Sequence, residues 1–228
     1  MPRSLHELLS VPNPAWPILQ KWIGAAKNTV ELLPASRPDC DEALVATQVT
    51  THSMMGAMIH QTGGLLIDHS WLRILGSGHP RLPRRIDRWN EQCKAANDGK
   101  QLGYLLVADD AVGGFFALDG GAFAAPNGHV WYFAPDTLRW ETLGRGYTDF
   151  IGFALNGDLH QYYENLRWPG WQEEVSRIGG DQVIGSYPPP WTKEGKDVAR
   201  AHRAAVPIGE AFGLNVLHFP KQLDGTSG

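Results

Sequence analysis

The sequence predicts an α+β fold with a mainly antiparallel, or mixed, central sheet and helices packed on it. The first observation is a series of short apolar runs between about residues 103 and 142, GYLLVA, FFALD, HVWYFA and LRWETL, broken by DDAVGG and PDT. Aromatic and β-branched runs separated by Asp and Gly are typical of a four-strand meander. The second observation is helical spacing of apolar residues on both sides of the meander.

The composition favours one folded domain over residues 1–228. The chain is 43% hydrophobic and contains nine Trp, so it can bury a sizeable core, and its 26 Gly and 16 Pro follow no repeat period. Residues 168–228 carry weaker patterns and a Pro188-Pro189-Pro190 stretch, which favours an extended backbone. We therefore expect a C-terminal extension or arm packed on the same domain.

The charge and the cysteine content narrow the classes of function. The net charge is -4, with 20 basic and 24 acidic residues, which gives no general attraction to nucleic acid or to an anionic membrane. The N-terminal stretch lacks the apolar core of a secretory signal, and no run approaches the length of a spanning helix. Cys40 and Cys93 lie in segments with helical patterns, so we expect reduced packing thiols in a cytoplasmic protein.

The segments before the meander predict a mixture of helices and strands. Ser4, followed by Glu7 at the third position, is a capping-box pattern for a first helix. The segment from Val49 to Leu75 is rich in Thr, Met and Ile. This composition predicts two or three strands, with a glycine turn at Gly63-Gly64. The other elements expected here are a helix over residues 14–26, a strand over 29–33, a helical segment from 36, a loop over 76–80 and a helix over 83–99.

The segments after the meander predict further helices. An apolar band from Phe150 to Leu155 indicates a helix that ends at Asn156-Gly157, and Asp158 is the expected cap of the next one. A last helical turn is expected over residues 172–175.

The polar residues show no pattern for a metal, a cofactor or a catalytic centre. His52, His60 and His69 are eight and nine positions apart, which matches neither a helical zinc motif nor a Cys/His knuckle. Asp109-Asp110 could serve as paired carboxylates, but adjacent residues point in different directions and Asp is common in turns, so we predict a turn role. The glycine pairs lack phosphate-binding spacing, and Ser77 and His79 are too close in sequence for a nucleophile and its base.

The aromatic residues of the meander are the strongest candidates for a binding surface. Strand alternation places Trp131 and Phe133 on one face and Val130 and Tyr132 on the other, so both faces need a helix or a partner to cover them. An aromatic patch left uncovered would mark a protein-binding surface.

Three long strings resemble an uncharacterised bacterial family known only as a domain of unknown function: TGGLLIDHSWLRILGSGHPRLP, GYLLVADDAVGGFFALDGG and WYFAPDTLRWETLGRGYTDF. The likeness extends from about residue 14 to residue 196. The segment from Ala108 to Ala154 is also similar, more loosely, to the SUKH superfamily. That likeness implies an α+β fold, and many SUKH proteins are immunity proteins that neutralise toxins. It implies no catalytic residues.

The interpretation that follows is a non-enzymatic module that binds another protein, with a toxin as one such partner. The expected contact residues are His79, Arg81, Asp109, Asp110, Trp131, Asp136 and Trp140. One alternative is an enzyme acting on a small molecule in a pocket near Gly63 to His79, with His69, His79 and Arg73 as its polar groups. Another alternative is an oligomer-forming protein, such as a homodimer, joined through the edge of the meander.

Overall fold

The central element is an antiparallel sheet in which each strand pairs with the next one along the chain. The structure is a computed structural model that describes residues 2–123 and 128–220, and within these residues the sheet has seven strands in the order β1-β2-β3-β4-β5-β6-β7. β1 and β7 are therefore its two edges. The bounds are β1 Val30–Pro34, β2 Thr62–Ile67, β3 Leu72–Leu75, β4 Tyr104–Asp110, β5 Phe115–Asp119, β6 His129–Ala134 and β7 Arg139–Gly146.

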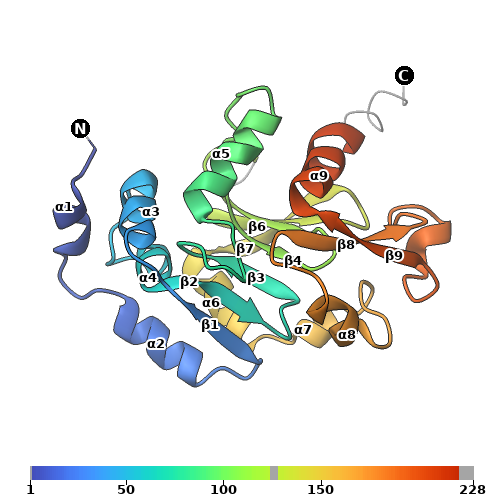
Figure 1. Ribbon diagram of the computed structural model, residues 1–228, viewed down its shortest axis with the longest axis horizontal. Helices are drawn as coiled ribbons and strands as arrows, with labels where there is room; N and C mark the ends of the chain where they lie inside the picture. Colours follow the sequence, from blue (N-terminus) through green and yellow to red (C-terminus); the bar gives the residue numbers. More distant parts are fainter. Residues whose placement is uncertain (1, 124–127, 221–228) are drawn as a thin grey trace.

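The helices surround this sheet, and a separate hairpin follows it in the chain. In Figure 1, α5 and α9 lie above the sheet, and α2, α6 and α7 lie below it. A second, two-stranded sheet pairs β8 (Gln182–Tyr187) with β9 (His202–Pro207). The helices are α1 Leu5–Leu9, α2 Trp16–Gly24, α3 Asp39–Thr47, α4 Met54–Gln61, α5 Ile86–Ala96, α6 Tyr147–Asn156, α7 Leu159–Tyr162, α8 Trp171–Ser176 and α9 Ile208–Phe212, with a 3-10 turn at Glu194–Lys196 and a π-helix at Gly213–His218.

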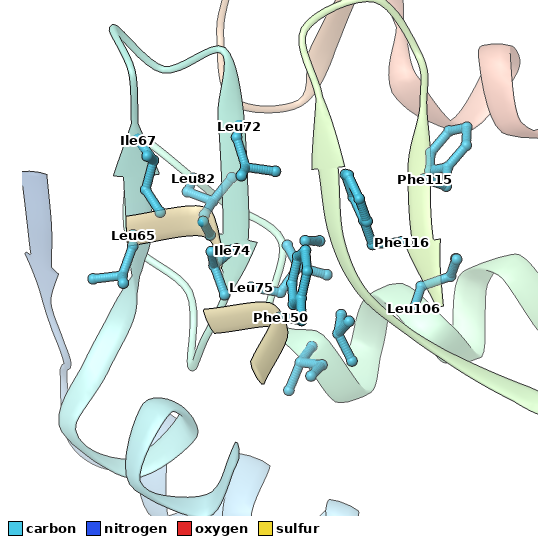
Figure 2. Close-up of a cluster of buried hydrophobic side chains, with 14 of the residues drawn as sticks. Leu65, Ile67, Leu72, Ile74, Leu75, Leu82, Leu106, Phe115, Phe116 and Phe150 are labelled. Atoms are coloured by element: carbon cyan, nitrogen blue, oxygen red, sulfur yellow. The ribbon is translucent and has the colours of Figure 1, made fainter. Parts of the chain in front are cut away.

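Both faces of the meander are apolar and both are covered by helices of the same chain. Phe116 lies 4.9 Å from Phe150 of α6, measured between ring centroids, on one face. Phe115 lies 5.3 Å from Phe212 of α9 on the other. Figure 2 shows the part of this core in which Phe116 of β5 and Phe150 of α6 meet side chains from β2 and β3. The α+β class and the mainly antiparallel sheet predicted from the sequence are confirmed.

Most of the locally specified elements lie where the sequence predicts them. The four strands of the meander and the helix after it are present, and Ser4 and Glu7 form the capping box of α1. Asp158 caps α7 through its side chain. Cys40 and Cys93 are free, buried and helical, as predicted. The second helix begins later than expected, at Trp16.

The prediction for residues 49–75 is wrong in two respects. Residues 54–61 form a helix, α4, and Gly63-Gly64 lies inside β2 rather than in a turn. A Cβ atom at Gly63 would lie 2.6 Å from the carbonyl oxygen of Gly78, so glycine serves a close approach of two backbones here. The real turn between β2 and β3 contains Asp68, His69 and Ser70, all with positive φ.

The C-terminal segment packs on the sheet through backbone contacts. The amide of Ile184 in β8 donates to the carbonyl of Ala111, at 2.7 Å, directly after β4. Phe212 of α9 also contacts Trp89 of α5, with ring centroids 6.2 Å apart. Within the part of the chain that the structure describes, no helix is both long enough and apolar enough to cross a membrane.

Gly63 of β2 allows a test of the close approach between its backbone and that of Gly78. We expect Gly63→Ala to lower the free energy of unfolding by about 1–3 kcal/mol, since the new methyl group would overlap main-chain atoms that cannot move easily. Gly24→Ala is the control, because Gly24 ends α2 with no neighbouring atom near its Cβ position, and it should stay within about 1 kcal/mol of the wild type. Urea unfolding of both variants measures the difference. Equal stabilities would contradict the packing shown here.

Candidate functional site

A carboxylate held between two arginines lies on the α5 and α9 side of the sheet. Asp109 of β4 is fully buried, and Arg73 of the neighbouring β3 is only 2% exposed. The Arg73 Nε lies 2.7 Å from Asp109 Oδ1, and Arg84 Nη1 lies 2.5 Å from Asp109 Oδ2. Burial lowers the pKa of Arg73, and the charge of Asp109 opposes that effect. The three side chains therefore form a buried ion cluster.

The same arginines hold the C-terminal segment. Arg73 Nη1 donates to the carbonyl of Gln182 at 2.7 Å, and Arg84 Nε donates to the carbonyl of Gly180 at 2.9 Å. Gly180 lies in the turn before β8, and Gln182 is the first residue of that strand. The ion cluster thus joins β3, β4 and the start of α5 to a segment roughly a hundred residues further along the chain.

Asp110 lies in a different environment from its neighbour. Its Oδ2 accepts from the Tyr132 hydroxyl at 2.7 Å, and its Oδ1 accepts from the amides of Val112 and Gly114 at 3.0 and 2.8 Å. Burial raises the pKa of Asp110 to about 6, although these hydrogen bonds favour the charged form. Tyr132 lies on the α6 side of the sheet, so the two carboxylates point to opposite faces.

Asp109 and Asp110 are therefore not surface contact residues. Both are 0% exposed, and both end β4 instead of lying in the turn after it. Asp110 does form the local hydrogen bonds to turn amides that the sequence predicts. Asp109 is tied to Arg73 and Arg84, which a turn prediction did not anticipate because both partners are distant in sequence.

The other predicted contact residues fall into three places. Trp131 and Trp140 are half-buried and lie together, both packed on Phe123, at centroid distances of 4.5 and 5.1 Å. His79 and Arg81 share the loop before α5, where Arg81 forms an exposed ion pair with Glu31. Asp136 lies in the turn that joins β6 and β7. The structure does not bring the seven residues into one surface.

A cavity of about 600 Å³ adjoins the β2–β3 turn and the loop before α5. His69 and Arg73 line it, but His79 does not, and Arg73 is engaged by Asp109 and Gln182. The three polar groups expected for an enzyme near Gly63 to His79 therefore do not converge.

A more apolar pocket of about 250 Å³ lies in the C-terminal part of the chain, where the sequence predicts an extension or arm packed on the domain. Its walls come from β8, β9, α9 and the Pro188-Pro189-Pro190 loop, with Trp168 and Trp191 as aromatic sides. The lining residues are Val112, Pro135, Leu166, Trp168, Val183, Ile184, Gly185, Ser186, Pro189, Pro190, Trp191, Val198, Arg203, Val206, Glu210, Ala211, Leu214, Asn215 and Phe219. Only the density of Trp and Pro in this segment could have pointed to it.

The positively charged residue of this pocket, Arg203, is already neutralised by a carboxylate. The Arg203 guanidinium lies 4.5 Å above the ring of Trp168 and binds both carboxylate oxygens of Glu174, at 2.9 and 3.1 Å. Hydrogen bonds from Arg203 lower the pKa of Glu174. Ser186, Glu210 and Asn215 are the other polar residues of the lining. They are the polar groups that could orient a ligand.

A separate group of metal-ligating side chains lies between α3 and α4. Cys40, Asp41 and His60 have their ligand atoms within 4.8 Å of one another. Of the three histidines weighed from the sequence, His60 thus lies with a cysteine and an aspartate that the sequence did not place beside it.

The same substitution, Asp to Asn, should destabilise the fold to different extents at Asp109 and at Asp110. Asp109→Asn should lower the free energy of unfolding by about 3–5 kcal/mol, because it leaves two buried arginines without a negative partner. Asp110→Asn should cost much less, since the amide oxygen can still accept from the backbone amides of Val112 and Gly114 and the NH2 group can donate to the Tyr132 hydroxyl oxygen. Chemical unfolding at neutral pH compares the two variants, and equal losses would contradict these roles.

The raised pKa of Asp110 also predicts that the free energy of unfolding depends on pH. Its pKa is raised in the folded chain, so the folded state binds the proton more tightly than the unfolded state does between about pH 4 and 6. The free energy of unfolding of the wild type should therefore fall relative to Asp110→Asn as the pH rises through this range, by up to about 3 kcal/mol. Unfolding curves from pH 4 to 7 measure this difference. A constant difference would contradict it.

Comparisons with known proteins agree with the likeness carried by the three long strings. Residues 5–211 match the family model described as "Protein of unknown function DUF2625". A putative uncharacterized protein of Escherichia coli strain K12, YbfG, is 44% identical over 84% of this chain and 87% of its own length. An uncharacterized protein of Haemophilus influenzae is 40% identical over 80% of each chain. No solved structure gives a significant match, and none of these matches supports the looser likeness to the SUKH superfamily. The chain therefore belongs to the DUF2625 family of proteins of unknown function.

Proposed function

We propose that this protein is a binding module whose C-terminal pocket holds a small, mostly apolar ligand. The observation that carries the proposal is the pocket itself, with Val183, Ile184 and Val206 on its floor of strands and Trp168 and Trp191 at its sides. Concave sites with apolar and aromatic walls and a few polar groups are the usual form of a small-molecule site. Its volume suits a single ring or a short alkyl chain.

The polar groups of the pocket favour a neutral or amine-bearing ligand. Arg203 is neutralised by Glu174 and also donates to the carbonyls of Val198 and Ala201, so it offers little attraction to an anion. Glu210 and Asn215 can instead accept a hydrogen bond from a hydroxyl or an amine. The ligand class is thus an apolar body that carries one hydrogen-bond donor.

The test compares ligand binding by the wild-type chain and by a variant whose pocket is filled with a larger side chain. We expect an environment-sensitive apolar dye to bind the wild-type chain, and small aromatic or aliphatic alcohols and amines to displace it. Val206→Phe places a ring in the pocket and should weaken dye binding by about tenfold or more, since the lost contact area is apolar. Fluorescence titration gives the affinities.

The matched control is Val45→Phe, the same substitution at an exposed position on α3. It should bind the dye like the wild type, and the melting temperatures of both variants should be compared. Equal binding by Val206→Phe and the wild type would overturn the proposal.

A second candidate keeps the protein-binding role expected from the sequence, with a toxin among the partners, but places the contact surface beside the C-terminal pocket instead of at Trp131 and Trp140. Two exposed apolar side chains favour it: Tyr187, which is 74% exposed at the end of β8, and Leu214, which is 42% exposed at the pocket. Exposed apolar groups beside a pocket are typical of protein-binding sites.

This candidate is tested by titrating the chain with each protein encoded by a neighbouring gene. Calorimetry should show binding that Tyr187→Ala weakens by about tenfold or more and that Trp131→Ala, in the meander, leaves unchanged. Absence of binding, or equal binding by Tyr187→Ala, would exclude this surface.

A further inference from the structure

Cys40, Asp41 and His60 come together because two helices pack side by side. Cys40 and Asp41 lie in the first turn of α3, and His60 lies in the last turn of α4. Cys40 is 2% exposed and His60 is 7% exposed, while Asp41 is half-buried. A thiol, a carboxylate and an imidazole therefore share one sheltered position at the edge of the core.

The distances among their ligand atoms are close to those of a metal centre. His60 Nε2 lies 3.0 Å from Asp41 Oδ1, and Cys40 Sγ lies 3.9 Å from the same oxygen. In a tetrahedral zinc site, with normal bond lengths, these separations are about 3.3 and 3.6 Å. The third separation, from Sγ to Nε2, lies within 4.8 Å and is about 3.6 Å in such a site, so the thiol and the imidazole would approach each other by up to about 1 Å to bind a common ion.

The surroundings supply the outer partners that such a site needs. The Gln61 side-chain amide lies 3.1 Å from His60 Nδ1. With its oxygen turned toward the ring, Gln61 would accept from Nδ1–H and hold Nε2 toward the ion, as outer partners of metal-bound histidines do. The second carboxylate oxygen of Asp41 lies 3.7 Å from the exposed Arg37, which leaves Oδ1 for the ion.

We propose that Cys40 Sγ, Asp41 Oδ1 and His60 Nε2 bind a divalent ion of the zinc class. A thiolate combined with an imidazole and a carboxylate selects Zn²⁺ or Co²⁺ over Mg²⁺ and Ca²⁺, which prefer oxygen ligands. Three protein ligands leave a fourth position for water. In Figure 1, α3 and α4 lie at the opposite end of the molecule from α9, β8 and β9, so this centre is separate from the C-terminal pocket.

The experiment uses the full, untagged chain with Co²⁺ as a spectroscopic probe and Zn²⁺ as its competitor. We expect one equivalent of Co²⁺ to produce a thiolate-to-cobalt charge-transfer band, and Zn²⁺ to remove it. Cys93→Ser, at the other buried cysteine, should keep the band, whereas Cys40→Ser should lose it. Zn²⁺ should raise the melting temperature of the wild type and of Cys93→Ser.

His60→Gln provides a second variant if Cys40→Ser fails to fold. Glutamine can keep a hydrogen bond to Asp41, so the fold should survive, while the affinity for Co²⁺ should fall by at least about tenfold. A wild-type chain with no charge-transfer band and no stabilisation by Zn²⁺ would overturn the proposal. Unchanged binding by either Cys40→Ser or His60→Gln would overturn it as well.

Discussion

The rest of the structure depends on the buried cluster in which Asp109 is held between Arg73 and Arg84. Moving three charges out of water is costly, and such a cluster is favourable only if its remaining hydrogen-bonding groups find partners. The carbonyls of Gly180 and Gln182 provide part of that compensation. The cluster therefore stabilises the folded chain only when the C-terminal segment is docked, which makes this segment part of the core.

The sheet separates two polar environments that neighbouring residues occupy. Strand alternation points Asp109 toward the arginines and Asp110 toward Tyr132. Two arginines flank the carboxylate of Asp109 on one face, whereas burial raises the pKa of Asp110 beside Tyr132 on the other. Burial also raises the pKa values of Tyr132 and Tyr163 well above their ordinary range. Two consecutive residues of one strand thus have different partners, which are two arginines for Asp109 and a tyrosine with backbone amides for Asp110.

The sequence predicted the elements whose formation is determined by residues close together in the chain. The meander, the capping box at Ser4 and the helix after Gly146 depend on turns, caps and periodicity within a few residues, and all three are present. Gly63 could not be interpreted correctly, because its reason is the backbone of Gly78 across the sheet. Asp109 and the C-terminal pocket were missed for the same reason, since their partners lie far away in the chain. Charge pairing and cavity shape are tertiary properties that no local pattern contains.

The pocket and the ion cluster are linked through the C-terminal segment. Val112 follows β4 and lines the pocket, while Val183 and Val206 belong to the hairpin that Arg73 holds through Gln182. A ligand in the pocket touches both parts and therefore binds only the docked arrangement. Such a ligand shifts the equilibrium toward docking by its own binding free energy. Asp109 stabilises the same arrangement, so ligand binding and the buried charges act on one docking equilibrium. A substitution of Asp109 should therefore weaken the apparent affinity for the ligand, and the ligand should in turn stabilise the docked ion cluster.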